Sequence, residues 1–280
     1  MKFNLGCQLK YNINQPSTLV FNLSVINNEY QRILQENLNI DPKTDYDEYI
    51  DPYAKNRYFR INASSGELEV SYQATVELSH FYAEPKEVPE VPPADIPLET
   101  LPYLYPSRYC QSDKLMRLTQ YEFGDLKPGY SRVTAVCNWI HDNVTYLSLS
   151  TDPNTSAYDT ATQRVGVCRD FAHLGIAFCR ALNIPARFVS AYAYGLQPPD
   201  FHACFEAYLG DRWYLFDPTR LAPQTGIVRI GTGRDAADVS FATFFGGVQM
   251  EQMHVFMDYV LEPDTISEMP SYTISAIATC

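Results

Sequence analysis

A cysteine, a histidine and an aspartate with the chemistry of nucleophilic catalysis lie in the second half of the chain. Cys168 stands in the segment GVCRDF, His202 in FHACFE and Asp217 in WYLFDP. A cysteine thiolate attacks carbonyl carbon, a histidine transfers the protons that this reaction moves, and a carboxylate orients the histidine. Together the three residue types indicate a thiol nucleophile acting on an acyl group.

Cys168 lies at the first position of a predicted helix. Apolar residues at 171, 174, 178 and 182 recur at helical spacing, and the helix should end before Pro185. The unpaired N–H groups and positive dipole end of a helix N-terminus favour a thiolate over a thiol, and they can bind the oxyanion formed when a carbonyl is attacked. Gly166 lets the chain turn sharply before the cysteine. A cysteine in this place more often serves packing, so its partners decide the interpretation.

His202 and Asp217 fall on two neighbouring strands of a predicted hairpin. A two-residue loop at 210–211 places Asp217 opposite Cys204, which makes Asp217 the diagonal neighbour of His202 on one face of the sheet. Diagonal neighbours are about 7–8 Å apart at the backbone, within reach of a hydrogen bond between carboxylate and imidazole. Such a bond fixes the tautomer and orientation of the histidine.

The segments GVCRDFAHL, His202-Ala203 and YLFDPT resemble the bacterial transglutaminase-like family of proposed cysteine proteases. The resemblance implies a papain/transglutaminase-like α+β core, with helices packed on an antiparallel sheet. It also implies a triad of Cys168 as nucleophile, His202 as general base and acid, and Asp217 as the residue that orients it. SGELEVSYQATVEL resembles the N-terminal β-domain of that family, LPYLYPSRYCQSDKL its interdomain segment, and GRDAAD a further motif.

Cys204 departs from the family, which usually has tryptophan two residues after the histidine. Residues i and i+2 of a strand share a face, so Cys204 should lie beside His202. There it could alter the choice of acyl group, form a redox pair with Cys168, or act as a rival nucleophile. A thiol in mid-strand lacks the electrostatic environment of a helix N-terminus, which makes the last interpretation the weakest.

The activity that the resemblance favours is that of a cysteine peptidase or amidase, with a peptide or protein amide as substrate. Two alternatives stay open: an amine acyltransferase of the protein transglutaminase type, and a catalytically inert binding or scaffold protein on the same core. No cofactor is expected. Zinc held by Cys168, His202, Cys204 and Asp217 is disfavoured, since the chain has neither an HExxH motif nor a CxxC pair.

Other polar residues near these motifs have competing interpretations. Gln163 could donate a hydrogen bond to an oxyanion, but a surface position in the preceding turn is the stronger interpretation. His173 is five residues along the helix from Cys168 and should make a structural hydrogen bond. Tyr192 either lines the cleft or packs in the core. Arg234 and Asp235 should form an ion pair that stabilises a turn.

Residues 1–83 have the pattern of a small all-β, sandwich-like domain. Even positions from 68 to 78 are apolar and odd positions from 67 to 79 are polar, which predicts a strand with one buried face. Segments 19–25 and 58–61 predict two more strands. Between them, residues 41–57 contain five acidic residues and two prolines, and we expect an acidic surface loop there.

Residues 84–106 contain seven prolines and predict an extended, semi-rigid linker. Its apolar end, from residue 101 onward, should pack on the second domain. Residues 107–280 form the predicted catalytic core, with helices over 133–144 and 168–182. Ser131 is the expected N-cap of the first helix. Strand-like runs at 186–194, 201–209 and 212–216 follow the helices, and this order is typical of an α+β fold.

The net charge of −12, from 21 basic and 33 acidic residues, disfavours nucleic acids and anionic membrane surfaces as partners. No segment has the roughly 20 apolar residues of a membrane helix, and the first residues lack the apolar run of a signal peptide. Seven scattered cysteines suggest free thiols in a reducing compartment. These features predict a cytoplasmic protein.

Overall fold

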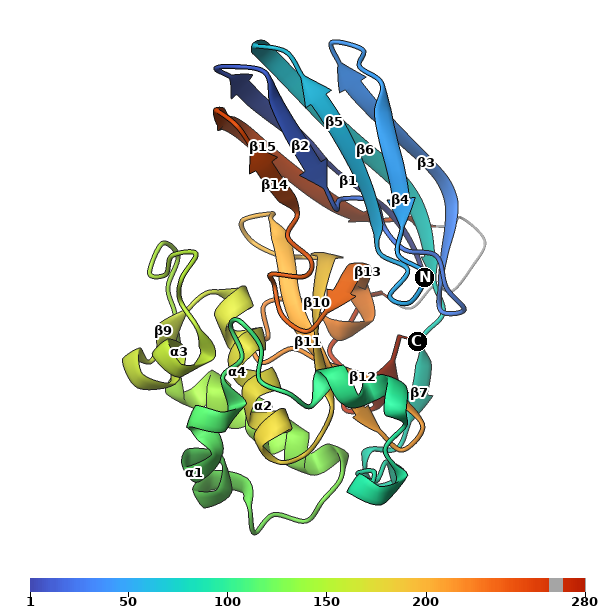
Figure 1. Cartoon of the computed structure of the whole chain (residues 1–280). Helices are drawn as coiled ribbons and strands as arrows, with labels where there is room; N and C mark the ends of the chain where they lie inside the picture. Colours follow the sequence, from blue (N-terminus) through green and yellow to red (C-terminus); the bar gives the residue numbers. More distant parts are fainter. Residues whose placement is uncertain (262–268, 280) are drawn as a thin grey trace.

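The computed structural model describes residues 1–261 and 269–279, which form a β-sandwich and an α+β core (Figure 1). The sandwich consists of two four-stranded antiparallel sheets, ordered β15-β1-β6-β3 and β14-β2-β5-β4. Its strands are β1 (Lys2–Ile13), β2 (Ser17–Phe21), β3 (Gln31–Asp41), β4 (Tyr46–Ile50), β5 (Arg57–Ala63), β6 (Gly66–Leu78), β14 (Ala242–Phe245) and β15 (Val248–Tyr259).

The core has a six-stranded antiparallel sheet ordered β13-β10-β11-β12-β16-β7. Helix α4 packs on β10 and β11, and the other three helices pack on α4. The elements are β7 (Phe81–Ala83), α1 (Ser112–Phe123), α2 (Tyr130–Asn143), β8 (Thr145–Tyr146), α3 (Ala157–Gln163), β9 (Val165–Gly166), α4 (Cys168–Ala181), β10 (Ala186–Ala193), β11 (Phe201–Leu209), β12 (Arg212–Phe216), β13 (Ile227–Gly233) and β16 (Ala276–Ala278). Strands β8 and β9 form a separate short parallel pair.

Strand β6 confirms the strand predicted from alternating polarity. All six of its even-numbered residues from Leu68 to Leu78 are buried in the sandwich. The prediction of an acidic loop over residues 41–57 is wrong for the middle of this range. There, β4 pairs with β5 at the edge of a sheet. All five residues of β4 are exposed, and Asp47 forms an ion pair across the strands with Arg60 at 2.6 Å. An edge strand with both faces in solvent shows no hydrophobic alternation, so the sequence pattern did not reveal it.

The strand pairing crosses the boundaries that the sequence suggested. Strands β14 and β15 lie after residue 107, but they pair with β2 and β1 and complete the two sheets of the sandwich. Figure 1 shows these orange and red strands beside the blue strands of the first residues. Conversely, β7 pairs with β16 in the core sheet. The sandwich is therefore built from residues 2–78 and 242–259, with most of the core between these two segments.

The proline-rich segment 84–106 lies against the core. Three short 3-10 turns interrupt its extended course. The Val88 carbonyl accepts a hydrogen bond from the N–H of Tyr130 at 3.0 Å, and the Val88 side chain is buried. Tyr103 packs edge-on against Trp213 with ring centroids 5.2 Å apart, as expected for the apolar end of this segment.

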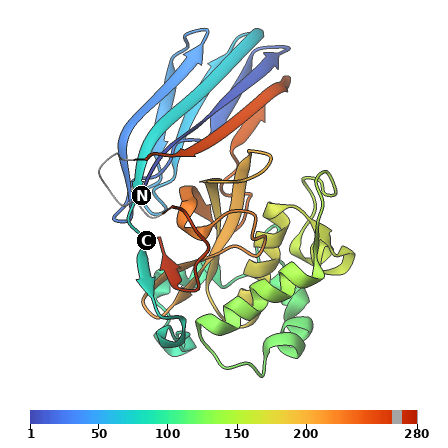
Figure 2. The same ribbon diagram turned by 180° about the vertical axis from the view of Figure 1, so that it is seen from behind.

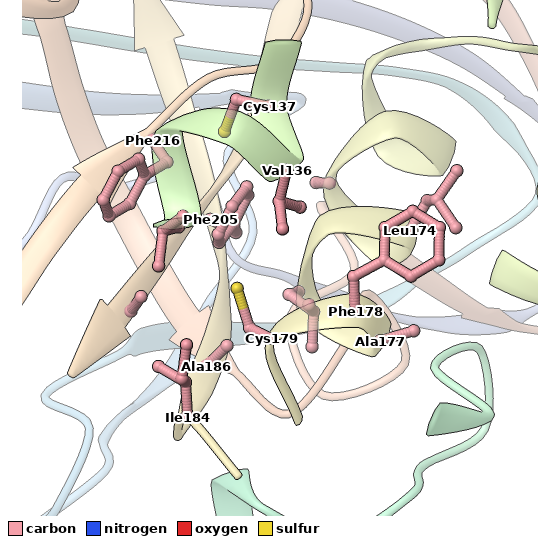
Figure 3. Close-up of a cluster of buried hydrophobic side chains, with 14 of the residues drawn as sticks. Val136, Cys137, Leu174, Ala177, Phe178, Cys179, Ile184, Ala186, Phe205 and Phe216 are labelled. Carbon is pink, nitrogen blue, oxygen red and sulfur yellow. The ribbon is translucent and has the colours of Figure 1, made fainter. Parts of the chain in front are cut away.

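Helix α4 is the centre of the core, because every residue from Asp170 to Ala181 is buried. It begins and ends as predicted. Figure 3 shows its side chains among apolar residues of α2 and of strands in the core sheet, including Val136, Cys137, Phe178, Cys179, Phe205 and Phe216. Helices α1 and α3 were not predicted, and α2 is preceded by Gly129 as N-cap instead of Ser131.

The sandwich and the core share one apolar cluster. Tyr192 of β10 and Phe201 of β11 are buried with residues of β1 and β2, and the Tyr192 hydroxyl donates to the Leu23 carbonyl at 3.1 Å. Tyr192 therefore packs between the domains. Of its two interpretations, a cleft-lining residue or a packed one, the structure supports the second. Seen from behind, both termini lie near the junction of the two domains (Figure 2).

Cysteines 7, 110, 137, 168, 179 and 204 are free, and Cys280 lies outside the described residues. Within residues 1–261 and 269–279, none of the helices has the length and apolar character required to cross a membrane.

Gly175 tests the packing of α4 against β11. A Cβ at this position would lie 2.5 Å from the ring of Phe205, so Gly175→Ala forces the ring to move. Overpacking costs about 1–3 kcal/mol, which outweighs the gain of up to about 1 kcal/mol from the helix propensity of alanine. We expect a lower free energy of unfolding in urea, with partial recovery in Gly175→Ala/Phe205→Leu. A single variant more stable than the parent would show that this contact is loose.

Candidate active site

Cys168 is held at the start of α4 by the residues on either side of it. The carboxylate of Asp170, in the first turn of the helix, accepts hydrogen bonds from the N–H of Val167 at 2.9 Å and from the hydroxyl of Thr151 at 2.8 Å. Asp170 is fully buried. A Cβ added to Gly166 would lie only 2.8 Å from the Cβ of Asp170. Glycine is therefore needed at 166 for close approach of Asp170. This network fixes the helix end that carries the thiol.

His202 and Asp217 meet through the hairpin of β11 and β12. The two strands pair from Leu209 opposite Arg212 to Phe205 opposite Phe216, the register expected from a two-residue loop. Asp217 follows β12, and its Oδ2 lies 2.7 Å from Nε2 of His202, with both side chains buried.

Thr219 holds the other oxygen of Asp217. Its backbone N–H and its hydroxyl donate to Oδ1 at 2.9 and 2.8 Å. The carboxylate therefore has one oxygen fixed by Thr219 and one directed at the imidazole of His202. Sequence reasoning missed Thr219, although an aspartate two residues before a threonine is a recognisable turn signal. It also missed the hydrogen bond of Asp170 to the backbone at the start of α4. The signal for it was an acidic residue in the first turn of a predicted helix.

The imidazole of His202 is protonated over a wide pH range. Burial lowers its pKa, but the charge and hydrogen bond of Asp217, together with Cys168, outweigh burial and raise the pKa to about 10. Nε2 is occupied by Asp217, whereas Nδ1 is buried and has no hydrogen-bond partner among the described residues. Nδ1 is thus the atom left to exchange a proton with a group at Cys168.

Tyr146 is a further residue beside Cys168. Strand β8 pairs with β9, which leads into α4, and places Tyr146 opposite Gly166. Its ring packs against Phe171 with ring centroids 5.7 Å apart, and its hydroxyl lies near the backbone and the thiol of Cys168. Partial burial and the neighbouring Cys168 raise the pKa of Tyr146 to about 12, so the phenol keeps its proton. No pattern in the sequence indicates this contact.

Cys168 and His202 open on one cavity of about 410 Å³. The core contributes residues of β10, β11 and the segment after β13, and the sandwich contributes residues of β1, β14 and β15. The structure thus brings all three predicted residues to one place, with Cys168 and His202 at the cavity and Asp217 behind the histidine.

Comparison with known proteins identifies the fold. Residues 1–98 match the family model of the bacterial transglutaminase N-terminal domain, and residues 117–218 match that of the transglutaminase-like superfamily core. The crystal structure of a proposed cysteine protease from Cytophaga hutchinsonii is similar with a TM-score of 0.93. It is 44% identical in sequence, over 99% of this chain and 97% of that one. The chain belongs to the transglutaminase-like superfamily.

Two mycobacterial proteins share part of the chain. An uncharacterised protein of Mycobacterium leprae is 32% identical over 117 residues, which cover 39% of this chain and 42% of that protein. One of Mycobacterium tuberculosis H37Rv is 36% identical over 116 residues, 36% of this chain and 37% of that protein. This chain thus spans about two fifths of the length of these curated relatives. The predicted family and the α+β fold, a transglutaminase-like core with an N-terminal β-domain, are confirmed.

In the transglutaminase-like core, Cys204 is fully buried in an apolar cluster with Val189 and Leu215. Burial, with Asp217 nearby, raises the pKa of its thiol well above the usual range. A buried, protonated thiol is a poor nucleophile, which argues against Cys204 as the rival of Cys168. Both cysteines are free thiols.

The remaining predicted residues lie around the site. Gln163 is exposed at the end of α3, as its surface interpretation predicts. The structural hydrogen bond of His173 is confirmed, because its Nε2 accepts from the N–H of Ala236 at 3.1 Å.

The ion pair expected between Arg234 and Asp235 is wrong. Arg234 pairs with Asp238 at 2.9 Å. Asp235 is buried and accepts hydrogen bonds from the N–H groups of Tyr109 and Ala237, both at 2.9 Å. The Asp235 carboxylate is directed at a backbone donor of its own turn and at one of a distant segment, so it does not meet the adjacent arginine.

The buried pair of His202 and Asp217 makes stability depend on pH. Because the pKa of His202 is about 10 in the folded protein against an ordinary 6.5, the pair stabilises fully below pH 6.5, and this contribution is lost as the pH rises through 10. Asp217→Asn removes the largest contribution that opposes burial and therefore lowers the pKa of His202. We expect the variant to be destabilised by roughly 3 kcal/mol at pH 6.5, with a smaller difference towards pH 10.

Urea unfolding between pH 6.5 and 10, with an NMR titration of His202, measures this effect. The control is Asp211→Asn on the same hairpin, where an exposed carboxylate pairs with Arg212 and contributes little. A difference between parent and Asp217→Asn that stays constant from pH 6.5 to 10 would contradict the assignment.

Proposed function

We propose that the chain is a thiol enzyme that cleaves an amide through a thioester of Cys168, acting as a cysteine peptidase or amidase. The observation that carries the proposal is the arrangement of three side chains. Cys168 stands at a helix N-terminus on a cavity, and His202 lies beside it with Nδ1 unoccupied and Nε2 held 2.7 Å from Asp217. In this proposal Cys168 is the nucleophile, His202 the general acid and base, and Asp217 the orienting residue.

The reaction begins with attack of the Cys168 sulfur on the carbonyl carbon. A protonated imidazole beside a thiol favours the thiolate, and His202 is protonated at neutral pH. The sulfur–carbon bond forms, the carbon–nitrogen bond breaks, and His202 gives its proton to the departing amine. His202 then takes a proton from water as the water attacks the thioester. The acid leaves and the thiol is restored.

The oxyanion needs hydrogen-bond donors close to the sulfur. We assign this role to the backbone N–H of Cys168 and to the hydroxyl of Tyr146, which lies near the backbone and the thiol of Cys168. A phenol that keeps its proton is a donor at neutral pH. When a substrate carbonyl enters, the Tyr146 hydroxyl can donate to the oxyanion.

Water and an amine compete for the same thioester. If an amine attacks, the product is a new amide, as in protein transglutaminases. A peptide substrate incubated with a fluorescent primary amine distinguishes the two outcomes by mass spectrometry. We expect the hydrolysed acid as the main product. Predominant incorporation of the amine would instead establish acyl transfer.

Alkylation kinetics test the nucleophile. At pH 6.5, two units below the ionisation of a free cysteine near 8.5, we expect iodoacetamide to label Cys168 at least tenfold faster than it labels glutathione. His202→Ala should remove this advantage, whereas His254→Ala, an exposed histidine on β15, should keep it. Mass spectrometry locates the label. A Cys168 no more reactive than glutathione would favour the inert binding protein.

Tyr146→Phe tests the oxyanion assignment. Alkylation of a thiolate by iodoacetamide forms no oxyanion, whereas acylation by a p-nitrophenyl ester does. The variant should therefore lower the ratio of the acylation rate to the alkylation rate, by up to about a hundredfold if Tyr146 is a main donor. Tyr158→Phe, at an exposed tyrosine of α3, is the control. An unchanged ratio in Tyr146→Phe would remove Tyr146 from the reaction.

A further inference from the structure

The cavity in front of Cys168 has an apolar wall from the sandwich. We call this set of residues the sandwich wall: Leu9 and Tyr11 of β1, Phe244 of β14, and Met250 and Met253 of β15. The core contributes Phe201 and Phe241, whose rings stack with centroids 4.1 Å apart. A substrate held at Cys168 thus has large apolar surfaces of both the sandwich and the core within reach.

A β-bulge turns the two methionines toward this cavity. Lys10 pairs with Gln252 and Tyr11 pairs with Met250, so that Glu251 is an extra residue in β15. Without it, positions 250 and 253 would lie on opposite faces of the strand. With it, both methionines share the inner face with Leu9 and Tyr11.

The two methionines are only partly covered. Met250 is 45% and Met253 43% exposed, whereas Leu9 and Tyr11 opposite them are almost fully buried. Exposed apolar area at the mouth of a reactive cavity gains free energy when a ligand covers it. Methionine is flexible and polarizable, so it adapts to side chains of different shape.

Tyr11 is the most deeply buried residue of this wall. Its side chain is 1% exposed and lines the cavity, and its hydroxyl is enclosed. The five residues of the sandwich wall thus bring no charged group to the cavity, which fits an apolar side chain of a substrate.

We propose that the cavity binds a large apolar side chain, aromatic or branched aliphatic, next to the reacting carbonyl of the substrate. The sandwich then selects the amide that reaches Cys168. This inference rests on the proposed role of Cys168 as nucleophile, and it assigns the N-terminal domain to substrate recognition.

The test compares alkylating reagents that differ only in their tail. Rate constants for Cys168 are measured with iodoacetamide, N-benzyl iodoacetamide and an iodoacetamide with a carboxylate tail of similar size. Each is divided by the rate constant of the same reagent with glutathione. We expect the benzyl reagent to exceed iodoacetamide by roughly tenfold or more, as burial of an aromatic ring in an apolar site predicts, and the carboxylate reagent to show no gain.

Two variants on β15 locate the effect. Met253→Asp should lower the ratio of the N-benzyl iodoacetamide rate to the iodoacetamide rate to near one. The milder Met253→Gln should lower this ratio partly. The matched control Gln252→Asp places the same charge on the adjacent, outward-facing residue and should keep the ratio of the parent protein. An equal loss in both aspartate variants would overturn the assignment to the sandwich wall.

The outcomes separate this inference from the proposed function. Fast labelling of Cys168 by iodoacetamide without any gain for the benzyl tail would overturn the apolar subsite and leave the nucleophile in place. Slow labelling by all three reagents would overturn both. Faster labelling by the benzyl reagent that is lost only in the Met253 variants would support both the apolar subsite and the nucleophile.

Discussion

Burial of α4 along almost its whole length is the constraint on which the rest of the core depends. From Asp170 to Ala181 the helix is enclosed by other helices and by β10 and β11. A helix buried in this way can reach solvent only at an end. The N-terminal end is the one that opens on the cavity, and it carries Cys168. The position of the thiol is thus set by core packing, with Asp170 satisfying the backbone at the point where the helix begins.

The partners of Cys168 come from a different kind of constraint. His202 and Asp217 are positioned by the register of a tight hairpin, and Thr219 fixes the carboxylate from behind. Helix packing and strand register are independent, so the site forms only where both are satisfied. The sandwich adds a third part by covering the cavity with β1, β14 and β15.

The sequence predicted those features that depend on local rules. The contact of His202 with Asp217 followed from a two-residue loop, and the start of α4 followed from helical periodicity before a proline. Features that depend on distant pairing were not predictable. Strand β4 has no buried face, and the return of β14 and β15 to the first strands joins segments far apart in the chain. Tyr146 reaches Cys168 only because β8 and β9 pair.

The return of β15 to β1 has a consequence for synthesis of the protein. Strand β1 is made long before β15, so one of its edges has no partner until residues 248–259 emerge. The same holds for β2 and β14. The core between them can pack α4 earlier, because its helices and the strands beside them are contiguous. Unpaired strand edges are prone to association with other chains. The nascent protein therefore exposes two such edges until residues 242–259 have been made.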